Sequence, residues 1–162
     1  MIGGNEMIIV NLAEFAKEIH WNAVDHGWWE GERVDEECLA LIHSEWSEAL
    51  EEYRAGRPLV WHKCPYNGGM CETQNVHQGD FDCRSCTPGK RKPEGIAVEL
   101  VDGCIRILDF LEHTGYPIPP MELVERTMEM MTLPPKKLPY HIAKLHKYTA
   151  LADENLDNGH LI

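Results

Sequence analysis

Positive charge is scarce in this sequence of 162 residues. Fifteen Lys and Arg residues stand against 27 Asp and Glu residues, which gives a formal net charge of −12 at pH 7. A chain this acidic repels the phosphate backbone of DNA or RNA unless a metal or a local concentration of basic residues intervenes. We therefore expect no nucleic-acid polymer among its partners.

Long apolar runs are also missing. Residues 1–20, MIGGNEMIIVNLAEFAKEIH, contain no basic cluster and only a short apolar stretch, so they match neither a secretory signal nor a membrane span. We expect a cytoplasmic protein with no membrane partner. In that reducing compartment the six Cys residues would be reduced or bound to metal rather than paired in disulfides.

The alternating pattern of a β-strand is absent as well, whereas helical spacing of apolar residues recurs. We predict a single all-α domain over residues 1–162, a four- to five-helix bundle in which a Cys-rich insertion, residues 57–92, separates two central helices. The 43% of hydrophobic residues suffice for one core. The predicted helices span roughly residues 8–25, 35–55, 93–113, 119–131 and 138–154.

The predicted helix over residues 93–113 carries few charges. Its segment IAVELVDGCIRILDFL contains only Glu99, Asp102, Arg106 and Asp109 as charged residues, and these share a strip roughly 80° wide on the helix. A helix that is apolar over the rest of its circumference is buried, so the acidic strip needs a cationic partner. Burial on this scale also predicts a homodimer or homotetramer.

The helix over residues 35–55 offers further acids. In HSEWSEALEEY, Glu45, Glu48 and Glu52 lie on the flank of the apolar stripe, and the two acidic strips could meet across a helix pair. Taken alone, these glutamates are more typical of a solvated helix face. Carboxylate-bridged di-iron bundles use Glu-x-x-His, which this chain lacks. Ligands that are all oxygens favour Mg²⁺, or else Mn²⁺.

Two motifs together carry a family resemblance. Glu45 and Glu48 form E-x-x-E within LIHSEWSEALEEYRAG, and Glu99 and Asp102 form E-x-x-D within KPEGIAVELVDGCIRILDF. The pairing resembles the MazG-like branch of all-α nucleoside triphosphate pyrophosphohydrolases, over roughly Trp21 to Gly115. The resemblance implies that the four acids bind Mg²⁺, which positions the polyphosphate and activates water for cleavage to a nucleoside monophosphate and pyrophosphate.

Other residues are candidates for contacts to the nucleotide substrate. Lys92 ends a short basic run and could approach a triphosphate, although a solvated loop explains the run equally well. Trp28, like Trp29 and Trp61, could stack on a base, but packing is the commoner use of Trp. Arg106 completes the substrate-binding candidates, and Glu51 or Glu52 could position water.

Four cysteines in the insertion have a spacing that resembles a zinc site. Cys64, Cys71, Cys83 and Cys86 give C-x6-C-x11-C-x2-C, and four thiolates make a closed structural Zn²⁺ centre that would organise an otherwise patternless loop. The alternative is that these thiols bind no metal. Cys38 and Cys104 fall on expected core positions of helices.

A second hypothesis for function stays open. The end of the chain lacks the Lys…Asn…Arg pattern that the family uses downstream for phosphate contact, and the insertion exceeds its usual connection. The chain could therefore be a non-catalytic, zinc-stabilised interaction or regulatory module on the same helical fold. The preferred interpretation is the Mg²⁺-dependent pyrophosphohydrolase.

Overall fold

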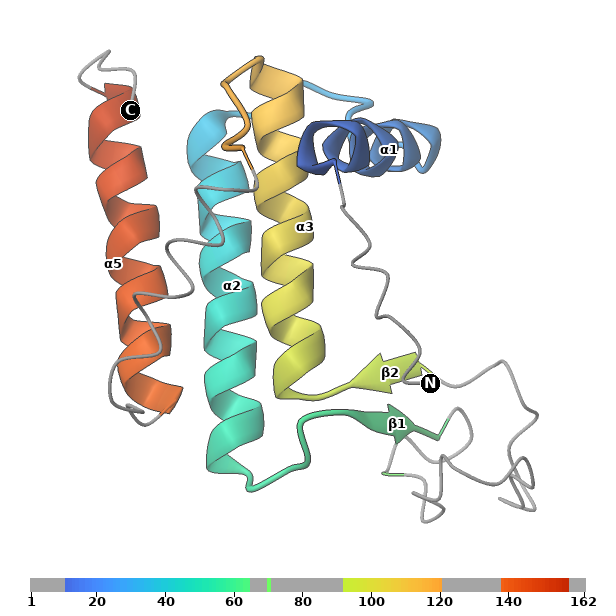
Figure 1. Ribbon diagram of the computed structural model, residues 1–162, viewed down its shortest axis with the longest axis vertical. Helices are drawn as coiled ribbons and strands as arrows, with labels where there is room; N and C mark the ends of the chain where they lie inside the picture. Colours follow the sequence, from blue (N-terminus) through green and yellow to red (C-terminus); the bar gives the residue numbers. More distant parts are fainter. Residues whose placement is uncertain (1–10, 65–69, 71–91, 121–137, 158–162) are drawn as a thin grey trace, which may run out of the picture. The chain divides into compact units, whose positions relative to one another are not determined.

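The computed structural model describes residues 11–64, 70, 92–120 and 138–157. For residues 155–157 it describes the backbone only. Helices predominate in this part of the chain, which agrees with the predicted helical class (Figure 1). The predicted helix over 119–131 lies, from residue 121 onward, outside the described residues. The elements are α1 (Leu12–Asp25), α2 (Asp35–Arg54), β1 (Trp61–Lys63), β2 (Lys92–Glu94), α3 (Ile96–Thr114) and α5 (Leu138–Asp157).

The two strands correct the prediction that no strand forms and that Pro93 opens a helix. β1 and β2 pair antiparallel, with His62 opposite Pro93, and α3 begins only at Ile96. A strand of three residues is too short to show an alternating pattern, and a proline without an N–H is tolerated in β2, which among the described residues pairs with β1 alone.

Contacts within the chain divide it into two compact units, and α2 and α3 each contribute to both. Unit 1 consists of Met1–Cys38 and Ile105–Lys136, and unit 2 of Leu39–Cys104 and Lys137–Ile162. The candidate carboxylates Glu45, Glu48, Glu99 and Asp102 all belong to unit 2.

In unit 2, α5 runs alongside α2 on the side away from α3 (Figure 1). The largest fully buried side chains are those of Ile42, Trp46 and Ile142, which supply the core between these helices. The indole N–H of Trp46 donates to Oγ1 of Thr149, 3.1 Å away, so that the polar atom of the buried ring is satisfied. This core fixes the face of α2 that carries the candidate acids.

In unit 1, the side chain of Asn11 caps α1 by accepting a hydrogen bond from the backbone N–H of Glu14. Ala16 and Ala23 are its buried residues. The chain leaves α1 through Gly27, whose φ of 76° lies in the left-handed region that favours glycine. The next residues, Trp28 and Trp29, are thereby placed at the end of α1.

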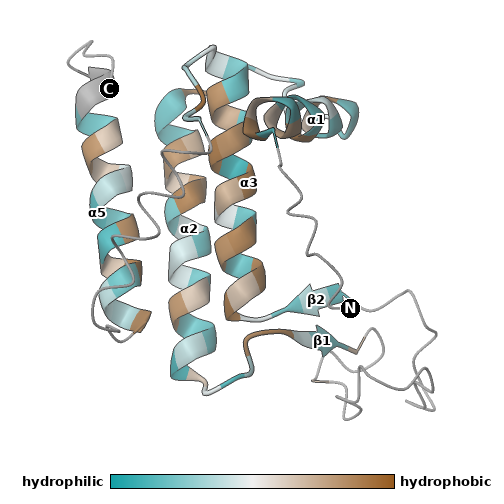
Figure 2. Ribbon diagram, in the orientation of Figure 1, coloured by the Kyte–Doolittle hydropathy of each residue, from teal (hydrophilic) through white to brown (hydrophobic). Residues whose placement is uncertain are grey.

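Hydrophobic residues lie along much of α3 (Figure 2), yet the helix is not buried all round as predicted. Val101 is 56% exposed and Ile105 37% exposed, and Cys104, expected in the core, is also exposed. Cys38 is buried, as predicted. Within the described residues this face of α3 is uncovered, because α2 packs on the side of α3 that carries Glu99 and α5 lies on the far side of α2. Among the described residues, no helix has the length and apolarity needed to cross a membrane.

Candidate metal centre

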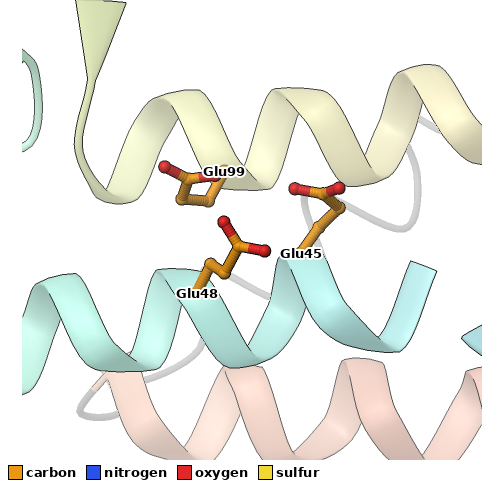
Figure 3. A group of neighbouring side chains, drawn as sticks. All are labelled: Glu45, Glu48 and Glu99. Atoms are coloured by element: carbon orange, nitrogen blue, oxygen red, sulfur yellow. The ribbon is translucent and has the colours of Figure 1, made fainter. Parts of the chain in front are cut away.

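Three carboxylates converge in unit 2. Glu45 and Glu48 of α2 and Glu99 of α3 each offer one oxygen, and these atoms all lie within 4.8 Å of one another (Figure 3). Glu45 and Glu99 are only 5% and 6% exposed, whereas Glu48 is exposed. Figure 3 shows the three side chains in the space between the two helices. The group is thus mostly withdrawn from water but open on the side of Glu48.

Each helix places its acids for a local reason. Glu45 and Glu48 are three positions apart on α2, so they lie one turn above each other on the same face. Glu99 lies in the first turn of α3, where its backbone N–H donates to the carbonyl of Gly95. An acid in the first turn is also favoured by the positive end of the helix dipole.

Gly95 joins β2 to α3 and has a φ of +113°, which side-chain-bearing residues rarely adopt. A Cβ at this position would lie 2.8 Å from the carbonyl oxygen of Leu59 and 2.9 Å from that of Pro58. The Leu59 carbonyl also accepts a hydrogen bond from the N–H of Ala97, at 2.9 Å. The loop after α2 therefore holds the start of α3, and with it Glu99, against α2.

The three acids repel one another. The pKa of Glu99 is raised from 4.5 to about 7, mainly by burial and then by the neighbouring charges of Glu48, Asp102, Glu45 and Glu94, in that order. Near neutral pH this carboxyl group is therefore shared between its protonated and ionised forms. A divalent cation among the three oxygens would replace the proton and relieve the repulsion.

Asp102, the fourth predicted ligand, lies outside the group of three. It is half-buried on the next turn of α3, and its charge is the second-largest neighbouring influence on the pKa of Glu99. The structure thus brings together three of the four predicted metal ligands, with Asp102 adding negative charge beside them.

Glu52 and Trp61 have structural partners. The indole N–H of Trp61 donates to Oε2 of Glu52 at 2.7 Å, and Arg57 approaches Oε1 at 3.4 Å. Arg57 also lies over the Trp61 ring, 4.6 Å from its centroid, and Trp61 is only 4% exposed. The suggestions that Glu52 positions water and that Trp61 stacks on a base therefore receive no support, because both side chains join α2 to β1. Glu51 is exposed on α2.

The predicted substrate-binding residues occupy different places. In unit 2, Lys92 pairs with Glu94 at 3.3 Å, and this hydrogen bond, together with the charges of Glu94, Glu99 and Asp102, raises the pKa of the lysine. In unit 1, the guanidinium carbon of Arg106 lies 5.0 Å from the ring centroid of Trp28, a cation–π contact. Lys92 is thus a cation within electrostatic range of the carboxylates.

The predicted zinc site falls largely outside the described residues. Cys64 directly follows β1 and is 3% exposed. Cys71, Cys83 and Cys86 lie outside the described residues.

One histidine pair was not anticipated from the sequence. His43 of α2 and His146 of α5 have their Nδ1 atoms 2.8 Å apart and their rings within 9° of parallel. Burial and the neighbouring His43 lower the pKa of His146. The two residues are 103 positions apart, so no local pattern could have paired them.

No protein-family model, curated protein or solved structure matches this chain at a significant level. The geometry of the site and the two motifs therefore carry the functional argument.

Proposed function

We propose that this chain is a Mg²⁺-dependent nucleotide pyrophosphohydrolase of the MazG-like, all-α type. It would hydrolyse a nucleoside triphosphate to the monophosphate and pyrophosphate in the cytoplasm, as a homodimer or homotetramer. The observation that carries the proposal is the convergence of Glu45, Glu48 and Glu99 to within 4.8 Å from two separate helices.

The donor set is suited to a hard divalent cation. All three groups are carboxylates, two of them buried, and the protein has a surplus of negative charge. Mg²⁺ binds such oxygens while keeping several waters, and Mn²⁺ accepts the same ligands. We assign Glu45, Glu48 and Glu99 to direct ligation and Asp102 to a fourth position or to the waters around the ion.

The reaction consists of water attacking a phosphorus of the α–β anhydride while the bridging oxygen leaves with the bonding electrons, and the proton of water passes to solvent. A bound Mg²⁺ would polarise the phosphoryl oxygens and lower the pKa of the attacking water. The side chains of the chain hold and orient the substrate. Lys92, which belongs to the same unit as the carboxylates and has a side chain that is 71% exposed, is assigned to the polyphosphate.

The proposal is tested by pyrophosphate release from a panel of ribo- and deoxynucleoside triphosphates, with and without Mg²⁺. We expect Mg²⁺-dependent release by the native chain and at least a hundredfold loss in Glu99→Gln and Glu48→Gln. Glu36→Gln is the matched control, because Glu36 is an exposed acid on the same helix as Glu48 and has no assigned role in the site. No release from any nucleotide, or equal release by Glu99→Gln, would overturn the proposal.

A further inference from the structure

A second organised cluster lies in unit 1 and contains none of the proposed metal ligands. Its centre is Asp109 of α3, a carboxylate that is 8% exposed. Nδ1 of His20, from α1, lies 2.7 Å from Oδ1 of Asp109, and the indole N–H of Trp29 donates to both carboxylate oxygens at 3.1 and 3.2 Å. The buried charge is therefore satisfied from two sides.

Trp29 also fixes a second histidine. The ring of His113, at the end of α3, stacks on Trp29 with centroids 3.6 Å apart and planes 10° apart. His20 meets the same indole edge-on, at 5.8 Å. The rings of His20 and His113 are consequently held with their centroids 5.5 Å apart and tilted by 55°. One tryptophan thus sets the positions of both imidazoles.

The contact with Asp109 decides which nitrogen of His20 is available. An ionised carboxylate only accepts hydrogen bonds, so Nδ1 of His20 carries the proton and Nε2 of the neutral ring carries a lone pair. Within the described ranges, no hydrogen bond occupies Nε2 of His20 or either ring nitrogen of His113. His113 is exposed and His20 is 22% exposed, so both imidazoles are accessible from solvent.

We propose that His20 and His113 form a binding site for a borderline divalent transition-metal ion such as Zn²⁺, with Asp109 as the outer acceptor that orients His20. A carboxylate bonded to the far nitrogen of a ligating histidine is the usual second shell of such sites. Metal–nitrogen bonds of about 2.0–2.1 Å place two ligating ring centres roughly 5 Å apart, close to the separation found here. Water or a solute anion completes the coordination.

Nitrogen ligands distinguish this site from the three carboxylates of unit 2. Imidazole suits Zn²⁺, Ni²⁺ and Cu²⁺, whereas a purely carboxylate site suits Mg²⁺ and Mn²⁺. The proposal therefore does not depend on the pyrophosphohydrolase activity.

The experiment is a Zn²⁺ titration of the full chain, monitored through the ¹⁵N and ¹H resonances of the imidazole rings. The variants His20→Gln and His113→Gln identify which resonances belong to each of these two rings. We expect the signals of both rings to move together along a single saturating binding curve. Asp109→Asn should weaken binding about 10- to 100-fold. His113→Gln should also abolish the shift of the His20 signal while the circular dichroism stays that of the native chain, because His113 is an exposed side chain.

His26→Gln is the control, since His26 is an exposed histidine at the end of α1 whose Nδ1 lies 2.8 Å from the carbonyl of Asn22 rather than from a carboxylate. It should leave the titration unchanged. Glu99→Gln should leave it unchanged as well, which separates this site from the carboxylate centre. Signals of His20 and His113 that stay in place through several equivalents of Zn²⁺, or that move independently of each other, would overturn the proposal.

Discussion

The six-membered ring of Trp46 lies directly over Gly103, so closely that a Cβ on the glycine would overlap ring atoms Cζ3 and Cη2. Trp46 follows Glu45 on α2, and Gly103 lies one turn after Glu99 on α3. The missing side chain therefore lets the two helices approach closely enough for their carboxylates to meet. The metal centre depends on a glycine that bears no ligand.

Gly103→Ala should destabilise the fold by about 1–3 kcal/mol, because the added methyl group overpacks a fully buried indole. It should also weaken Mg²⁺ binding by separating Glu99 from α2. Denaturant unfolding monitored by Trp fluorescence measures the first effect. Gly31→Ala is the control, since a Cβ there meets nothing within 4 Å. Equal stability of the two variants would contradict the close approach.

Gly95→Ala should be at least as damaging, by roughly 1–3 kcal/mol, because the positive φ and two carbonyl oxygens oppose any side chain. The start of α3 must shift, and Glu99 shifts with it. We expect reduced stability in urea together with reduced Mg²⁺ affinity. If the variant kept native stability and native affinity, the link between the loop after α2 and Glu99 would be wrong.

The raised pKa of Glu99 predicts a specific pH dependence for the metal-free protein. The stability that the protonated Glu99 side chain contributes is fully present below about pH 4.5, the pKa of this group in the unfolded chain. It is lost as the pH rises through about 7, the pKa in the folded chain. The loss is at most about 3 kcal/mol. In EDTA, Glu99→Gln should therefore be more stable than the native chain at pH 8 and show no such gain at pH 4.

This comparison has an internal check. Adding Mg²⁺ at pH 8 should stabilise the native chain more than Glu99→Gln, since the variant lacks one of the carboxylates that bind the ion. Thermal unfolding with and without Mg²⁺ at the two pH values provides the data. If the difference in metal-free stability between the native chain and Glu99→Gln were the same at pH 4.5 and pH 8, the burial of Glu99 among like charges would be contradicted.

Trp61→Phe should cost about 1–2 kcal/mol of stability, because it removes the indole N–H that donates to Glu52 and leaves a partly buried carboxylate under-satisfied. It should leave the Mg²⁺ affinity unchanged, since Glu52 is outside the three-carboxylate group. Parallel urea unfolding and metal titration distinguish the two effects. A fall in Mg²⁺ affinity without a fall in stability would show that Glu52 takes part in metal binding.

Much of the carboxylate centre follows from helical spacing. Glu99 was predicted from its place on a narrow charged strip of an apolar helix, and Glu45 and Glu48 from spacing and the family resemblance. The spacing of residues within one helix does not show how close each side chain comes to the neighbouring helix. Asp102 was therefore predicted to be a metal ligand, although it lies outside the group of three carboxylates.

Other features depend on contacts between distant segments. Strands of three residues leave too little pattern to be detected. Pro93 resembled a helix start because proline favours the first turn of a helix, and its strand partner His62, about 30 positions away, gives no local signal. His20 and Asp109 are 89 positions apart. The exposed face of α3 escaped prediction because hydrophobicity alone does not reveal whether another helix covers it.

The central claim is that Glu45, Glu48 and Glu99 bind a divalent cation, and it is tested most directly by calorimetric titration of the native chain with Mn²⁺ at pH 7.5. We predict binding that Mg²⁺ displaces, an affinity at least tenfold weaker in Glu99→Gln, and native affinity in the surface variant Glu36→Gln. Equal Mn²⁺ affinity in the native chain and Glu99→Gln would contradict the account.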